Sequence, residues 1–492
     1  MYHWELVEAM FKENSPVKQH LDSYNEFVNK KIYEIIQEVN ESEAASLSKY
    51  TIRFNSIRLE KPVVVEADGS RKPLLPIEAR IRDRTYSASI YANISILEEG
   101  AEKDKAEVYI GELPVMLKSD LCYLKGLSKE ELIEKGEDPN DPGGYFIVSG
   151  SERVLVTIED LAPNRVIVSK DTVSGREVIT ASLFSVRKGF RAKVSVERRP
   201  DGIFYISFPS SPNNINAFII MRALGLESKN KILNAFSDKL EVINDVLLNL
   251  EAIEPKNMDE ALDYLGKRVA AGQSEEFRKN RAAYILDNYL LPHVGVKPED
   301  RLKKAHYIAR MIERMIEVAY GKREEDDRDH YANKRLRISG VLMEELFRYA
   351  LGHFIKDLKY QIDRAATRGR KMQVKTLVRP DALTDRIMFA MGTGMWLGGR
   401  RTGVSQLLDR LCYMATLSHL RRVNSPLMKT QQHFEARDLH PTHFGKICTH
   451  ETPEGQRVGL VKNLAIGCVI SSHEIEGLEP ELEKLGVKMI KD

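Results

Sequence analysis

The segment from Asn424 to Leu464 concentrates side chains that can take part in chemistry. Glycine and proline interrupt it six times, which predicts turns and lets the backbone approach a ligand closely. It also contains four histidines and four carboxylates: His433, His440, His443, His450, Glu435, Asp438, Glu451 and Glu454. A connecting loop without a function seldom needs this mixture, so we interpret the segment as part of a site.

Metal binding is the first chemistry to consider here. His440, His443, Cys448 and His450 offer four ligands within eleven residues, and zinc binds such side chains. Pro441 and the tight spacing depart from the usual ligand pairs, and no second pair follows. Packed, hydrogen-bonded histidines are therefore the preferred interpretation, and a zinc hydrolase built on these residues is kept as an alternative.

Two further patterns resemble ligand sites only superficially. The acidic run Glu324–Asp329 offers carboxylates to Mg²⁺, but interleaved basic residues favour an internal salt-bridged loop. The run GTGMWLGGRR (Gly392–Arg401) has Leu397 where the last glycine of a dinucleotide fingerprint belongs, and no G-x-x-x-x-G-K-[ST] loop is present. The sequence therefore indicates neither a magnesium site nor a nucleotide-binding fold of its own.

Charge is distributed unevenly along the chain. The net charge is +2, yet Lys356–Arg437 contains sixteen Lys or Arg against six Asp or Glu, a local net charge of +10. Positive charge concentrated on an otherwise acidic protein indicates a polyanionic partner. A solvated helical face is the alternative for any such run, but the overlap with the candidate site favours nucleic acid.

Two groups of basic residues are candidates for contacts with a phosphate backbone. Arg80, Arg82 and Arg84 alternate, so a strand would place all three on one face, although surface salt bridges explain the row equally well. Arg364, Arg368 and Lys371 share a helical face if the helix continues past Gly369. Sequence-independent phosphate binding is the function expected of the second group.

The periodicity of apolar residues predicts an α+β protein of two to four domains, since 492 residues exceed one core. Residues 1–50 are expected to be helical, 50–199 to form strands, 213–321 to be helical again, and 335–423 to begin as helix and then become glycine-rich. The four cysteines lie far apart, form no C-x-x-C pair and fit a reducing cytoplasm: Cys122, Cys412, Cys448 and Cys468. The sequence predicts neither an export signal nor a membrane span.

Several long motifs occur in one order along nearly the whole chain: GELPVML (Gly111–Leu117), GGYFIVSGSERVL (Gly143–Leu155), DDRDHYANKRLRISG (Asp326–Gly340), GVSQLLDR (Gly403–Arg410) and SHLRRVNSPL (Ser418–Leu427). In these motifs the chain resembles the second-largest subunit of multi-subunit DNA-dependent RNA polymerases. The variant resembled is archaeal, the N-terminal half (B double-prime) of a subunit split into two polypeptides.

The resemblance implies a domain order. A protrusion would comprise residues 1–165 and 322–390, and a lobe, 166–321, would be inserted in it. A fork with two fork loops would follow at 391–465. Residues 466–492 would start an external domain that continues on another chain.

The resemblance also implies roles for residues of the fork. Positions near the RNA–DNA hybrid or the substrate would be Arg401, Gln406, Asp409, His419, Arg422, Arg437, Glu451, Glu454 and Gln456. Fork loops Met395–Thr402 and Pro426–Glu435 would contact DNA through Trp396, Arg400, Lys429, Gln431 and Gln432. Trp396 would stack on a base or, alternatively, be buried in the core. Arg422 and Arg437 are expected to stabilise the hybrid and the substrate end.

The resemblance places the catalytic aspartates on the largest subunit and an accessory acidic pair on the other half of the split subunit. Mg²⁺ would therefore be held by partner subunits, and this chain would be inactive alone. Expected partners are the halves of the largest subunit, the C-terminal half of the second-largest subunit, smaller subunits, template DNA and nascent RNA, with no membrane. The alternative from a different class is a stand-alone nucleic-acid-binding or scaffold protein.

Overall fold

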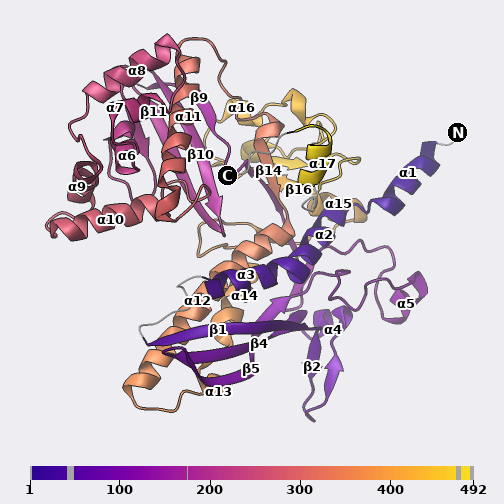
Figure 1. Cartoon of the computed structure of the whole chain (residues 1–492). Coiled ribbons are helices and arrows are strands. Elements are labelled where there is room, and N and C mark those ends of the chain that lie inside the picture. Colours follow the sequence, from indigo (N-terminus) through magenta and orange to yellow (C-terminus); the bar gives the residue numbers. More distant parts are fainter. Residues whose placement is uncertain (1–2, 42–48, 174, 472–477, 488–492) are drawn as a thin grey trace. The chain divides into compact units, whose positions relative to one another are not determined.

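The computed structural model describes residues 3–41, 49–173, 175–471 and 478–487 (Figure 1). The chain forms two compact units, Met1–Asp160 with Leu336–Asp492, and Leu161–Arg335. Both contain helices and mainly antiparallel sheets, which confirms the predicted α+β class. Of the expected external-domain start, 472–477 and 488–492 lie outside the described residues. The names protrusion, lobe and fork stay predictions.

Helices begin the first unit, as the periodicity of residues 1–50 predicts. They are α1 (His3–Glu13), α2 (Lys18–Glu26), a π-helical turn (Phe27–Lys31) and α3 (Ile32–Glu41). Strands and two short helices follow: β1 (Tyr50–Glu60), β2 (Val63–Val65), β3 (Arg71–Pro73), α4 (Pro76–Ile81), β4 (Ser87–Glu98), β5 (Ala101–Pro114), α5 (Lys129–Glu134), β6 (Phe146–Val148), β7 (Ser151–Leu155) and β8 (Thr157–Leu161).

After the second unit the chain returns to the first. The returning elements are β14 (Lys334–Arg337), α12 (Ser339–Thr367), α13 (Val374–Leu377), α14 (Asp381–Thr393), β15 (Ser405–Leu407), α15 (Tyr413–Leu420), β16 (Arg422–Asn424), α16 (Phe434–Arg437), 3₁₀ turns at Pro441–His443 and Gly455–Arg457, β17 (Val461–Asn463) and α17 (Leu478–Lys484). Among the described residues, no helix is long and apolar enough to cross a bilayer.

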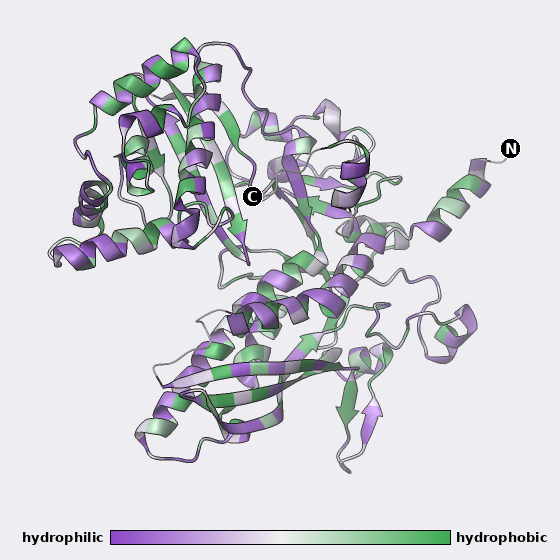
Figure 2. Cartoon of the chain, viewed as in Figure 1, coloured by the Kyte–Doolittle hydropathy of each residue, from purple (hydrophilic) through white to green (hydrophobic). Residues whose placement is uncertain are grey.

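The main core of the first unit lies between a sheet and helices. Strands β1, β4 and β5 form an antiparallel sheet in which every second residue of β4, including Ile90, Ile94 and Ile96, is buried. Figure 2 shows hydrophobic and hydrophilic bands along these strands. Helices α3, α13 and α14 contact the sheet, and α12 packs against α2 and α14. Burial of one strand face and one helix stripe is what holds these layers together.

Two smaller sheets attach the C-terminal segment to strands β7 and β8. Strand β15 pairs antiparallel with β7, with Gln406 opposite Val154. Strand β16 pairs parallel with β8 and antiparallel with β17, with Arg422 opposite Asn463. Because β7 and β8 are consecutive in sequence, one short stretch of chain pairs directly with two strands of the expected fork, β15 and β16.

The second unit consists of a five-stranded antiparallel sheet and helices, with the strand order β13-β12-β11-β10-β9. Its strands are β9 (Ile167–Val173), β10 (Arg176–Arg187), β11 (Phe190–Arg198), β12 (Phe204–Ser207) and β13 (Ile215–Asn216). Its helices are α6 (Ala217–Ala223), α7 (Lys229–Leu233), α8 (Leu240–Glu251), α9 (Met258–Val269), α10 (Glu275–Asn288) and α11 (Arg301–Ala319), with 3₁₀ turns at Pro298–Asp300 and Tyr331–Asn333. Helix α11 contacts β9, β10 and β11 and covers an apolar core.

The prediction that a strand aligns Arg80, Arg82 and Arg84 is wrong. Helix α4 contains Arg80, and Arg82 caps its C-terminal end. Pro76 starts the helix with a preset φ, and the Glu78 carboxylate accepts a hydrogen bond from the Leu75 N–H at 3.4 Å. These N-terminal helix signals outweigh the alternation of the arginines. A single phosphate-binding row is therefore absent at this place.

Helix α12 does not continue past Gly369, which the shared face of Arg364, Arg368 and Lys371 would require. Helix α12 ends at Thr367, and Gly369 adopts φ +60°, a left-handed conformation that terminates helices. Arg364 lies in the last turn and Arg368 caps it, but Lys371 lies beyond the helix. The three residues consequently do not share one helical face.

Lys462 and Glu159 form an ion pair in the sheet that holds β16. The Lys462 Nζ lies 2.9 and 3.2 Å from the two Glu159 oxygens, and both side chains are buried. We expect Lys462→Met to destabilise the first unit by about 3–5 kcal/mol, because it removes the cation that lies against the buried Glu159 carboxylate. Unfolding in urea, followed by the fluorescence of the buried Trp396, measures the loss.

The double variant Lys462→Met/Glu159→Leu provides the control, since it removes both buried charges of the pair. It should recover most of the lost stability. Equal destabilisation by the single and the double variant would contradict the ion-pair explanation.

Candidate nucleic-acid interface

Gln406, Asp409 and His419 form one hydrogen-bonded cluster, although they come from β15, the following loop and α15. The His419 Nδ1 accepts the Asp409 backbone N–H at 3.1 Å, and Nε2 lies 3.1 Å from the Gln406 Oε1. The backbone contact therefore assigns the proton to Nε2, which donates to Gln406. Burial, helped by the nearby Arg422 charge, lowers the pKa of His419 to about 4, so the imidazole is neutral at pH 7.

Arg422 begins β16 beside this cluster. Its side chain is half-buried, and it makes no hydrogen bond or ion pair with any described residue. A guanidinium that is partly removed from water without a partner is unfavourable. The position is therefore suited to an anion that is supplied from outside the chain.

The first expected fork loop, Met395–Thr402, is a tight turn closed by a bridge between Trp396 and Arg401. Trp396 is 0% exposed, and its indole N–H donates to the Leu342 carbonyl at 3.0 Å. A ring in this position cannot stack on a base, so the DNA contact expected of Trp396 is wrong and the core alternative is correct. Arg400, at the tip, is exposed and makes no hydrogen bond or ion pair with a described residue.

Arg401 points back toward the core instead of outward. Its guanidinium lies 3.5 Å from the Asp160 carboxylate and 3.4 Å from that of Glu345, and both acids also pair with Arg337. Because these acids already balance its charge, Arg401 anchors the first loop to β8 and α12. It is a weaker candidate for a hybrid contact than the sequence implied.

Arg437 joins two loops of the segment. Its Nη1 donates to the carbonyls of Gln456 and Val458, each at 2.9 Å. Its Nη2 donates to the carbonyls of Lys429 at 2.9 Å and Gln431 at 3.0 Å. One planar guanidinium thus closes the second fork loop onto the loop that carries Glu451, Glu454 and Gln456. We call this arrangement the Arg437 clamp.

Gly459 lets these loops approach each other. A Cβ atom there would lie 2.3 Å from the Arg437 carbonyl oxygen, and the residue has φ +69°. The Gly459 N–H donates to the Thr452 hydroxyl at 2.9 Å, and this hydroxyl donates to the Val461 carbonyl at 3.1 Å. Only glycine fits both the space and the backbone conformation.

The candidate contact residues of the two loops are exposed. Lys429, Gln431 and Gln432 are exposed in the second fork loop. Glu451, Glu454 and Gln456 are exposed in the other loop, where Glu451 accepts a hydrogen bond from the Ser418 hydroxyl. The clamp binds only backbone carbonyls, so the polar and charged side chains of both loops stay available for other contacts.

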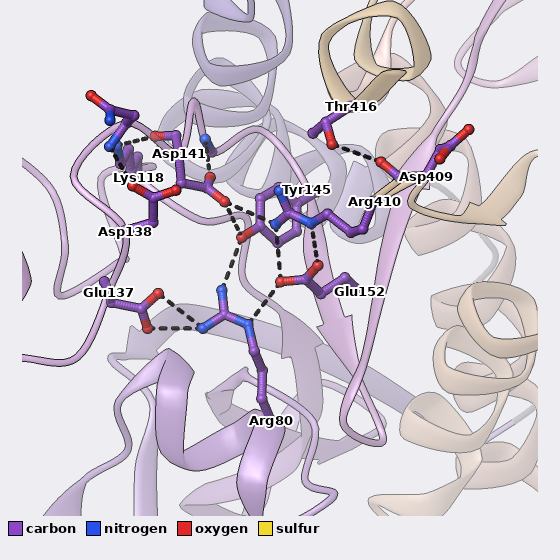
Figure 3. Close-up of polar contacts among 12 residues, drawn as sticks. Arg80, Lys118, Glu137, Asp138, Asp141, Tyr145, Glu152, Asp409, Arg410 and Thr416 are labelled. Carbon is purple, nitrogen blue, oxygen red and sulfur yellow. Dashed lines mark hydrogen bonds and ion pairs between the residues drawn. The ribbon is translucent and has the colours of Figure 1, made fainter. Parts of the chain in front are cut away.

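Arg410 has a structural role that its motif alone does not reveal. It donates to Glu152 at 2.6 and 3.0 Å and to Asp141 at 2.8 Å, and it lies over the Tyr145 ring (Figure 3). Arg80 reaches the same Glu152 at 2.8 Å from the other side. Burial raises the pKa of Glu152, but the two arginines outweigh it and hold that pKa below its ordinary value. The partners of Arg410 lie far away in sequence, so local spacing gives no signal for this network.

The basic residues of 356–437 do not form one surface. Glu345, the partner of Arg401, and Arg364 both lie on α12, separated by about 28 Å at 1.5 Å per residue. The side chains of Arg364, Arg368 and Lys371 are exposed and make no hydrogen bond or ion pair with described residues. The cations without a partner therefore divide into a group at the end of α12 and a second group in residues 391–465, which we call the fork segment.

The histidines considered for zinc have other contacts. The rings of His440 and His443 lie 6.1 Å apart, and the His440 Nδ1 contacts the Thr442 hydroxyl at 2.6 Å. Within the described ranges, no group of three His, Cys, Asp or Glu residues could hold a metal ion. In the described part of the chain, His440, His443, Cys448 and His450 therefore do not assemble into the zinc site considered from the sequence.

The buried histidines make stability sensitive to acid. His20, which donates to the Leu420 carbonyl at 2.7 Å, also has a pKa lowered to about 4 by burial. Between pH 6.5 and 4 the unfolded chain binds these protons and the folded chain does not, so stability falls as pH falls. Each histidine should contribute a slope of about 1.4 kcal/mol per pH unit.

His419→Gln should reduce this slope by about 1.4 kcal/mol per pH unit, because it removes the contribution of one buried imidazole. The measurement is the urea midpoint from Trp396 fluorescence across pH 4 to 7. His3→Gln, at an exposed position of α1, is the matched control and should leave the slope unchanged. A slope unaffected by His419→Gln would show that the buried imidazole does not control the acid response.

Known proteins are similar to this chain over nearly its whole length. A family model described as RNA polymerase beta subunit matches residues 15–385, and one described as RNA polymerase Rpb2, domain 3, matches residues 406–470. The second match includes the His419 cluster and the Arg437 clamp.

Curated relatives agree with the family models. DNA-directed RNA polymerase subunit Rpo2N of Methanococcus vannielii is 49% identical over 491 residues, covering 98% of each chain. Rpo2N of Methanocaldococcus jannaschii is 48% identical over 488 residues, also covering 98% of each chain. Subunit Rpo2 of Saccharolobus solfataricus is 48% identical over 491 residues, which are 99% of this chain and 44% of that relative.

The chain thus matches one subunit end to end in some archaea and under half of a longer subunit in another. This pattern favours a split polymerase subunit over a stand-alone scaffold protein. The chain belongs to the Rpo2N family, the N-terminal half of the split second-largest subunit of archaeal DNA-directed RNA polymerase, a nucleotidyltransferase (EC 2.7.7.6).

Proposed function

We propose that the fork segment forms part of the active-centre cleft and holds the RNA–DNA hybrid and downstream DNA during template-directed synthesis of RNA from ribonucleoside triphosphates. Support comes from its free cations, its exposed loops and the rigid strands beneath them. Positioning and electrostatic stabilisation dominate phosphoryl transfer, so such a surface contributes without holding the metal.

Arg422 is the single observation on which this proposal depends. It is half-buried, has no hydrogen-bonding or ionic partner among the described residues, and lies next to the fixed pair Gln406–His419. A phosphate of the hybrid would supply the missing anion, and a phosphate contact positions nucleic acid without reading its sequence. In this proposal, the hydrogen bonds among Gln406, Asp409 and His419 hold the surface beside Arg422 in place.

Arg437 has a different proposed role from the one the sequence implied. Its four hydrogen bonds to backbone carbonyls make it a positioning residue for the loops that would contact DNA and border the substrate. Lys429, Gln431 and Gln432 are the proposed DNA contacts, with Arg400 at the first loop. Arg364, Arg368 and Lys371 are proposed to bind phosphate at a separate place, beyond the end of α12.

The C-terminal half of the split subunit is the proposed partner of the apolar surface in this region. Large hydrophobic side chains are exposed there, with Leu411 at 90% and Phe444 at 85%. Exposed apolar residues in such number mark an interaction surface. The proposed assembly lies in the cytoplasm and also contains the halves of the largest subunit, smaller subunits, template DNA and nascent RNA. In this proposal the catalytic subunits hold the Mg²⁺.

Arg422→Ala tests the hybrid contact in a polymerase reconstituted with all its subunits. Stalled elongation complexes should dissociate about tenfold faster, as the loss of about 1.4 kcal/mol from one charge-assisted contact predicts. The slope of log lifetime against log salt should also decrease by about one phosphate contact. The decay of labelled transcript in the complex measures both.

Arg71→Ala is the matched control, because Arg71 is an exposed arginine on β3 of the same unit. Its complexes should decay like those of the unaltered enzyme. A lifetime and salt slope unchanged by Arg422→Ala would remove Arg422 from the proposed hybrid contacts.

A further inference from the structure

A pocket of about 340 Å³ lies within the second unit, away from the fork segment in sequence. Its lining includes four arginines, one tyrosine and one carboxylate: Arg165, Arg310, Arg314, Arg323, Tyr307 and Asp326. This volume is within the range of about 300–1,000 Å³ typical of small-molecule sites. Nothing in the polymerase function above uses this pocket.

Helix α11 supplies one wall. Tyr307, Arg310 and Arg314 follow at spacings of three and four residues, which places them on one helical face. The side chains of Arg310 and Arg314 make no hydrogen bond or ion pair with any described residue, and both are exposed. Arg165 donates once, to the Ala332 carbonyl at 3.1 Å, so most of its donors are available.

The lone carboxylate of the pocket does not neutralise these arginines. One Asp326 oxygen accepts from Arg323 at 2.8 Å, and the other accepts the Val168 N–H at 3.0 Å. With both oxygens used, four guanidinium groups and one carboxylate leave a net charge of +3 around the cavity. Like charges gathered without counter-charges repel one another, so the arrangement favours an anion.

Tyr307 is fixed at the edge of the cavity. Its hydroxyl donates to the Asn164 carbonyl at 3.2 Å, and the His293 ring packs edge-on against it with centroids 5.0 Å apart. The ring therefore offers a stationary face next to the arginines. Such a face suits the stacking of a planar ring, which would accompany a phosphate group in a nucleotide.

We propose that this pocket binds a diphosphate group, either as free pyrophosphate or as the end of a nucleoside diphosphate. A diphosphate carries about three negative charges at neutral pH and matches the net charge of the pocket. Each guanidinium can bind two phosphate oxygens at once, and a diphosphate has enough oxygens to serve several arginines, whereas a carboxylate has only two. A nucleic-acid backbone would instead favour an extended row of cations over a closed group.

Titration calorimetry with the full chain and inorganic pyrophosphate tests the proposal. Unaltered protein should bind one equivalent, and Arg310→Gln/Arg314→Gln should weaken binding at least tenfold. Both side chains are exposed, so the substitutions leave the core intact, and circular dichroism checks this. Arg281→Gln, at an exposed position on α10, is the matched control and should bind like the unaltered chain.

Competing ligands distinguish the sources. Tighter binding of ADP than of pyrophosphate, reduced by Tyr307→Leu, would identify a nucleoside diphosphate, and equal or weaker binding would identify free pyrophosphate. Orthophosphate or single-stranded DNA binding as tightly as pyrophosphate would overturn the proposal, as would equal weakening by Arg281→Gln. None of these outcomes depends on the fork segment, so the proposed hybrid contact is tested separately.

Discussion

The Arg437 clamp is the interaction on which the proposed interface depends. Its four carbonyl acceptors belong to the loop after β16 and the loop before β17, so one guanidinium joins the loops beyond the point where these two strands pair. Charge-assisted hydrogen bonds from one rigid, planar group restrict both loops at once. Gly459 makes this possible, because any side chain there would collide with the Arg437 backbone.

Strands β7 and β8 hold the strands of the fork segment by direct pairing. They receive β15 and β16, and the Arg410 network and the Lys462–Glu159 pair secure the same strands from two sides. Residues about 250 to 300 positions apart are thereby held in fixed register. A rigid foundation with outward-facing loops is what a surface for a long, uniform polyanion needs, since binding then orders little of the protein.

Sequence predicts much of this fold and less of the site. The helical and strand-rich regions follow from apolar periodicity, and the motifs identify the family. The alternation of Arg80, Arg82 and Arg84 misleads because the helix-start signals at Leu75 and Pro76 outweigh it. Contacts of Arg437 were unpredictable in a different way, since backbone carbonyls have no sequence signature. Likewise, only tertiary packing shows that Trp396 is buried and that the basic stretch divides along α12.

Hydrogen–deuterium exchange of Arg437→Gln in the full chain tests the central claim most directly. The clamp predicts faster exchange in both loops together, at amides such as Gln431, which bonds to the Met428 carbonyl, and Leu460, which bonds to the Arg457 carbonyl. Protection in β7 and β8 should remain as in the unaltered chain. Exchange that accelerates in one loop only, or in neither, would contradict the idea that one guanidinium holds the two loops as a unit.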